Sequence, residues 1–207
     1  MQTLGLASES KRSDGWLKSI FWPTVQNAWD VDYLGQQGFW ICTLLAGLQL
    51  GFAMLTGGGK PVLLVIGLFG ALLYWSGGMG VREKSWAAAA TVCAVYLLDT
   101  LLTIAGGLLL SPAGALHILM LGLLFSNLRA TLIAREWRPV AEGEDRPQRF
   151  NESLRDKLVD IWPPKLWPIL RIPFFVLGAL WCAFSALALV GIALVRLGVL
   201  RLPAPAQ

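Results

Sequence analysis

The sequence predicts an all-α, polytopic integral membrane protein: a bundle of about five transmembrane helices with short interfacial helices. Of its 207 residues, 56% are hydrophobic and only 14% are charged, whereas a soluble domain carries about a quarter charged residues. The mean hydropathy is +0.60, and the chain has 10 tryptophans, a residue type that collects where a membrane meets water. These observations indicate that the bilayer is the solvent of this chain.

Five apolar segments are long enough to cross about 30 Å of hydrocarbon. They cover residues 34–56, 61–79, 86–110, 113–134 and 170–195. Breaks rich in glycine or proline separate the first four: TGGGKP at 56–61, GGMGVREKS at 77–85 and SPAG at 111–114. PPKLWP, at 163–168, precedes the fifth segment and is not expected to continue a helix.

We therefore divide the chain into four parts. These are an N-terminal arm (1–32), a four-span bundle (33–134), a charged loop (135–169), and the fifth span with a short tail (170–207). The arm is expected to contain an interfacial helix at 15–29, broken near Pro23. The charged loop is expected to contain an amphipathic surface helix at 151–162. This loop is either a surface on which a partner docks or a solvated connector.

Lys and Arg set the expected orientation. Fourteen of the 17 lie in the N-terminal arm, in the break at 77–85, or in the charged loop and its flanks. By the positive-inside rule, the N-terminus is then cytoplasmic and the C-terminus outside, in a multi-pass protein of the plasma (inner) membrane. Because these cations flank the spans, where they meet lipid headgroups, the net charge of +4 does not indicate nucleic-acid binding.

One carboxylate, Asp99, lies in the middle of the third apolar segment, in the run AVYLLDTLLTI. An Asp at the centre of a membrane helix costs about 2.5–3.5 kcal/mol on insertion scales, so we expect it to face the interior of the bundle. Helical spacing puts Tyr96 and Thr103 on the same face. His117 and Gln49, on other spans, are further candidate partners. His117 differs from Asp99 by about 10 Å in depth, so Tyr96 or a water would have to link the two.

These five residues form the candidate intramembrane polar site, and its role is open between two alternatives. Asp99 is either a structural hydrogen-bonding group or an acid that takes part in proton or cation movement. In the fourth segment, Ser126, Asn127 and Arg129 approach the cytoplasmic edge. We interpret them as hydrogen-bonding groups between helices and an arginine that snorkels to the interface.

The sequence shows no catalytic constellation or cofactor motif, so we expect neither an enzyme nor a bound cofactor. The three cysteines lie on different segments, and a single histidine is present, which does not fit a zinc site. Two small-residue pairs, Gly47 with Gly51 and Gly67 with Ala71, favour close packing of helices.

The functional prediction is a non-enzymatic accessory, assembly or scaffold subunit. Its expected partners are the lipid bilayer and another membrane protein or a second copy of itself. The alternative is a small transporter or channel that uses Asp99.

Overall fold

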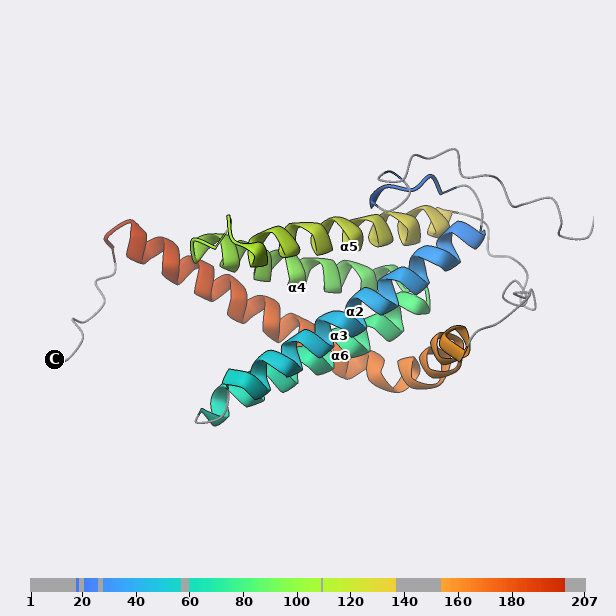
Figure 1. Cartoon of the computed structure of the whole chain (residues 1–207), viewed down its shortest axis with the longest axis horizontal. Coiled ribbons are helices and arrows are strands. Elements are labelled where there is room, and N and C mark those ends of the chain that lie inside the picture. The colour runs from blue at the N-terminus through green and yellow to red at the C-terminus, as the bar shows by residue number, and fades with distance from the viewer. Residues whose placement is uncertain are drawn as a thin grey trace, which may run out of the picture.

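The computed structural model describes residues 18, 21–25, 28–56, 60–108, 110–136 and 154–199. This part of the chain contains five long helices and no strand (Figure 1). The helices are α2 (Ala28–Thr56), α3 (Pro61–Arg82), α4 (Trp86–Ala105), α5 (Pro112–Glu136) and α6 (Leu154–Arg196). All five are long and apolar enough to cross a membrane. The predicted class, a helical polytopic membrane protein, is confirmed.

The charged loop up to residue 153 falls mostly outside the described residues, as do seven of the fifteen residues of the interfacial helix expected at 15–29. In the described part, the Trp22 N–H donates to the Lys18 carbonyl at 2.9 Å, and residues 23–25 are not helical. Two boundaries also differ from the prediction. The first span begins earlier, since α2 starts at Ala28. The third ends earlier, because α4 stops at Ala105 and Gly107 adopts a φ of 82°, a left-handed conformation that glycine tolerates best.

The predicted break at 77–85 is wrong in its first half, because α3 continues through the glycines to Arg82. These glycines allow close packing instead of making a turn. A Cβ at Gly80 would lie 2.4 Å from the Trp167 ring and 2.6 Å from the Ala88 side chain. The turn itself is short: Lys84 has a φ of 57°, and the Ser85 hydroxyl caps α4 by accepting from a backbone N–H at 3.3 Å.

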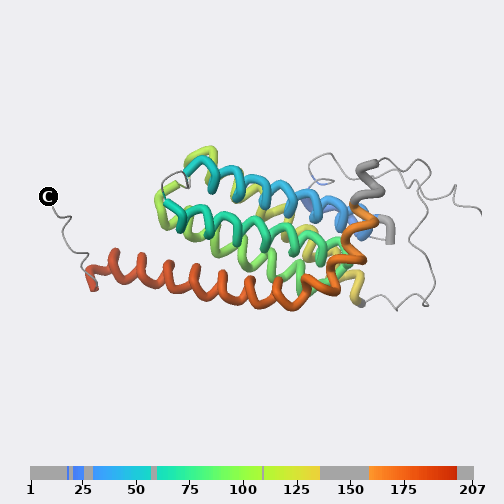
Figure 2. Tube along the Cα trace, turned by 90° about the horizontal axis from the view of Figure 1, so that it is seen from below, coloured from blue at the N-terminus to red at the C-terminus, as the bar shows by residue number. Residues whose placement is uncertain are grey.

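The structure of α6 also differs from the prediction. A surface helix, a proline break and a separate fifth span were expected, but one helix of 43 residues runs through all three. It holds four prolines in its interior: Pro163, Pro164, Pro168 and Pro173. Proline removes a backbone donor and bends a helix, yet its φ is compatible with helical geometry. Figure 2 shows the consequence, because the first part of α6 runs across the end of the bundle before the helix turns along it.

The helices are arranged as two hairpins and a crossing helix. Figure 1 shows the α2–α3 and α4–α5 pairs close together at one end and spread apart at the other. We call these the Arg82 end, where α3 finishes, and the far end. α6 starts at the Arg82 end and packs on both α3 and α4. At the far end, the Arg196 guanidinium donates to the carbonyl of Ala105 in α4.

Packing is uneven along α3. Within 73–82 every residue is buried except the half-buried Trp75, whereas within 61–72 only Gly67 and Gly70 are buried. The six consecutive residues 61–66 are all exposed, which is more than one full turn of helix. The α2–α3 hairpin therefore packs against the rest of the bundle mainly from the level of Gly70 to the Arg82 end.

Candidate functional site: the Asp99 cluster

The Asp99 carboxylate joins three helices. It lies in α4 and accepts a hydrogen bond of 2.7 Å from the Tyr74 hydroxyl of α3. Its other oxygen accepts one of 2.9 Å from the Trp181 indole Nε1 of α6. Each carboxylate oxygen therefore has a donor from a different neighbouring helix. Hydrogen bonds to an acceptor that can be ionised are among the stronger ones in proteins.

Small residues on the facing helices bring these donors into reach. A Cβ at Gly70 would lie 3.3 Å from the Trp181 ring, so the glycine makes room for this indole over α3. A Cβ at Gly178 would meet the Thr91 side chain at 2.7 Å, so α6 approaches α4 closely one turn before Trp181. Tyr74 is 1% exposed and packs edge-on against the Tyr96 ring, with centroids 6.1 Å apart.

The Tyr96 ring lies between His117 and Tyr74, one of the two residues that donate to Asp99. The Tyr96 and His117 rings stack, with centroids 5.4 Å apart and an interplanar angle of 13°. The His117 Nδ1 donates to the carbonyl of Ala113, one turn earlier in its own helix, at 2.9 Å. Among the described contacts His117 makes no hydrogen bond to Asp99, and the Tyr96 ring, which contacts both His117 and Tyr74, links the two sides.

The remaining two candidates do not bond the carboxylate in the described structure. The Thr103 hydroxyl donates at 2.9 Å to the backbone carbonyl of Asp99. The Gln49 side chain packs over Gly70, where a Cβ would lie 3.4 Å from its amide carbon. Gln49 is thus a neighbour of Trp181 at this level of the bundle. The predicted set consequently surrounds Asp99, but Tyr74 and Trp181, which bind it, were missed.

A second polar cluster, also missed, lies at the Arg82 end. The Arg82 guanidinium donates to Asp32 of α2 at 2.6 Å and to Asp160 of α6 at 2.5 Å. The Arg82 side chain is 1% exposed, that of Asp32 5% and that of Asp160 26%. The sequence carried a usable signal, because Asp32 and Arg82 both lie at span ends that meet at the same side of the membrane. From the sequence alone, Arg82 is only one of the cations in the break at 77–85.

The α5 residues noted from the sequence lie at the same end. The Asn127 amide donates to the carbonyl of Leu34 in α2, and the Arg129 guanidinium donates to the carbonyl of Pro23 at 3.1 Å. Arg129 also lies over the Trp22 ring, 4.8 Å from its centroid. The Asn127 contact agrees with its interpretation as a hydrogen-bonding group between helices. The buried Ser126 hydroxyl has no such bond among the described residues, and Arg129, expected to snorkel, instead binds the neighbouring segment of Trp22 and Pro23.

Within the described ranges, no group of three or more His, Cys, Asp or Glu side chains is placed to hold a metal ion. Comparison with protein-family models, curated proteins and solved structures gave no match to this chain. The chemistry of the sites must therefore be read from their geometry. The Asp99 and Arg82 clusters each tie α3 to α6, one in mid-membrane and one at the membrane edge.

Proposed function

We propose that this protein is a non-enzymatic accessory, assembly or scaffold subunit that packs against other membrane proteins. The observation that carries the proposal is the bare far half of the α2–α3 hairpin. Residues 61–66 of α3 are exposed on every side, and Phe52 and Leu55 of α2 are exposed beside them. Lipid can cover such surface, but helices in membranes gain stability from packing against each other, which a partner helix would supply here.

The small-residue pairs support the same proposal. Gly67 makes a close contact between two helices of this chain, because a Cβ there would lie 2.1 Å from the Ala53 side chain of α2. Gly47 and Gly51 behave differently, since nothing lies within 4 Å of where their Cβ atoms would be. A second helix could approach the α2 backbone closely at this pair.

The geometry of Asp99 favours this role over the alternative, a small transporter or channel. Both carboxylate oxygens are engaged by donors from neighbouring helices. The best-formed groove of the described residues lies along α2 and shares no lining residue with the Asp99 cluster. An acid that carries ions or protons needs a path to solvent, whereas a helix joint needs none.

We further propose that the Arg82 end faces the cytoplasm and the far end the outside of a plasma (inner) membrane. The cation bias of the sequence supports this orientation. Green fluorescent protein, which fluoresces when it folds in the cytoplasm, is expected to fluoresce when it is fused after Lys84. Alkaline phosphatase fused after Gly107 should be active only outside. The reverse pattern would refute the orientation.

The packing role is tested with a photoreactive benzoyl-phenylalanine in place of Phe69, an exposed residue in the far half of α3. Illumination of intact membranes is expected to yield a discrete protein adduct of higher mass. The matched control carries the same group at Phe184 of α6. Phe184 is more exposed, but it lies on a helix that already packs one face on the bundle.

A further inference from the structure

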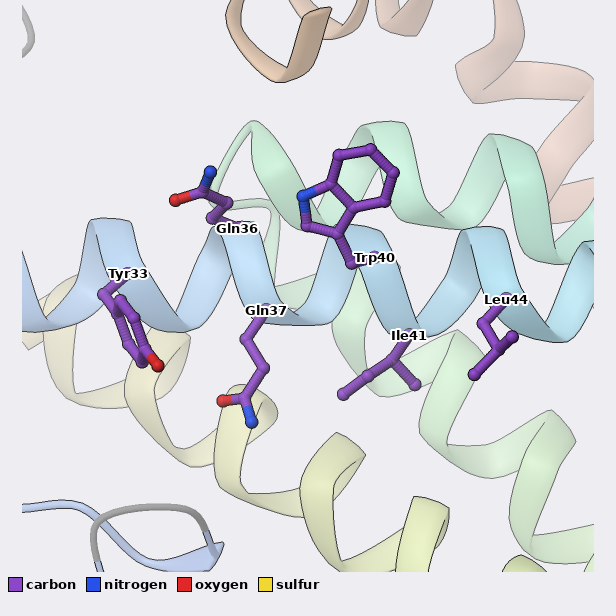
Figure 3. Close-up of a pocket in the computed structure, with 6 residues that line it drawn as sticks. All are labelled: Tyr33, Gln36, Gln37, Trp40, Ile41 and Leu44. Atoms are coloured by element: carbon purple, nitrogen blue, oxygen red, sulfur yellow. The ribbon is translucent and has the colours of Figure 1, made fainter. Parts of the chain in front are cut away.

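A groove of about 240 Å³ follows the exposed side of α2 near the Arg82 end. Its lining residues are Tyr33, Gln36, Gln37, Trp40, Ile41 and Leu44. Figure 3 shows Gln36 and Trp40 to one side of the α2 axis and the other four to the opposite side. The groove is open, since Tyr33 and Leu44 are about half exposed.

The groove is polar at one end of its length along α2 and apolar at the other. The phenol and the two amides come first, at the end nearest Arg82, and the apolar side chains of Trp40, Ile41 and Leu44 follow. From Tyr33 to Leu44 the helix rises by about 16 Å. Since the membrane span of α2 begins at Asp30, the polar part lies at the headgroup and ester level, and the apolar part lies at the level of the acyl chains.

Gln37 is the amide that lies next to the apolar part of the groove. Its side chain is half-buried and makes no hydrogen bond within the described part of the chain. At the headgroup and ester level, such an amide can donate to the oxygens of a lipid. An occupant that offers hydrogen-bond acceptors near Gln37 and hydrocarbon near Leu44 matches both parts of the groove.

We propose that the α2 groove binds one glycerophospholipid of the leaflet that meets the Arg82 end. Its ester and phosphate oxygens accept from the Gln37 amide, and an acyl chain lies along Ile41 and Leu44. A second helix fits this groove less well, because the bulky Trp40 and Tyr33 side chains line it. The place on α2 that allows close helix approach is Gly47–Gly51, outside the groove.

The test is native mass spectrometry of the full chain, stripped of lipid in detergent and titrated with palmitoyl-oleoyl phosphatidylethanolamine. The wild type is expected to hold one lipid that survives activation. Gln37→Leu should weaken its binding by about 3–10-fold, the effect of one lost hydrogen bond. Thr43→Val removes a polar group from a half-buried residue of the same helix that does not line the groove, and should bind as the wild type does. Equal thermal unfolding midpoints would show that the variants remain folded.

Three results would overturn the proposal. The first is the absence of a one-to-one lipid adduct in the wild type. The second is equal lipid binding by wild type and Gln37→Leu, or equal loss in Gln37→Leu and Thr43→Val, which would indicate general lipid contact. The third is a dimer of this chain that is lost in Gln37→Leu, which would make a second copy the occupant of the groove.

Discussion

Arg82→Met is expected to destabilise the protein by about 3–5 kcal/mol, the cost typical of removing one partner from a buried ion pair. The substitution keeps an unbranched apolar stem but removes the guanidinium that binds both carboxylates. Most of the cost should come from Asp32, because its side chain is 5% exposed. Asp160, at 26%, is better solvated, so its share is smaller. The measurement is thermal unfolding in detergent micelles, followed by circular dichroism.

Two controls separate the charge effect from lost packing. Arg82→Lys keeps the charge but cannot fork between two carboxylates, so an intermediate loss is expected. The triple variant Arg82→Met, Asp32→Asn, Asp160→Asn removes all three charges and should recover much of the lost stability, since a buried ion pair is often replaceable by neutral groups. If the triple variant is no more stable than Arg82→Met, unpaired charge is not the cause.

Asp99→Leu is expected to show the second large effect. It leaves the buried Tyr74 hydroxyl and the half-buried Trp181 N–H without an acceptor, at about 1–3 kcal/mol for a fully buried group. Asp99→Asn keeps one acceptor oxygen and should cost much less while preserving expression and oligomeric state. Unfolding midpoints of the two variants, measured side by side, give the comparison.

Tyr74→Phe provides the matching control. Added to Asp99→Leu, it should restore part of the stability, because the orphaned hydroxyl is then gone. A fully additive double variant would mean that the hydrogen bond contributes nothing. If instead Asp99→Asn abolishes a proton-coupled transport activity in an intact fold, Asp99 is a functional acid and the transporter alternative holds.

The sequence predicted helices and their number better than their boundaries, because hydrophobic length is a property of each segment alone. Glycine was ambiguous: the run at 77–80 could mark a turn or a close contact, and only the neighbouring helices decide. The prolines at 163–168 predict the end of a helix. In the structure α6 continues through them with a bend, and Trp167 packs there against Gly80 of α3.

The candidate site shows the same limit. The energetic cost of a lipid-exposed carboxylate selected Asp99 for attention. Helical spacing then offered neighbours on the same helix, Tyr96 and Thr103, because those positions follow from sequence. Tyr74 and Trp181 are 25 and 82 residues away, and their approach depends on how the helices cross. No single-sequence pattern contains that information.

Photocrosslinking from position 69 is the most direct test of whether another membrane protein covers the far half of α3. The expected result is a discrete adduct from benzoyl-phenylalanine at Phe69, which mass spectrometry identifies as a partner protein or a second copy of this chain, and little or none from Phe184. If both positions give only uncrosslinked chain and lipid adducts in native membranes, lipid alone covers the α2–α3 hairpin, and the proposed scaffold role is contradicted.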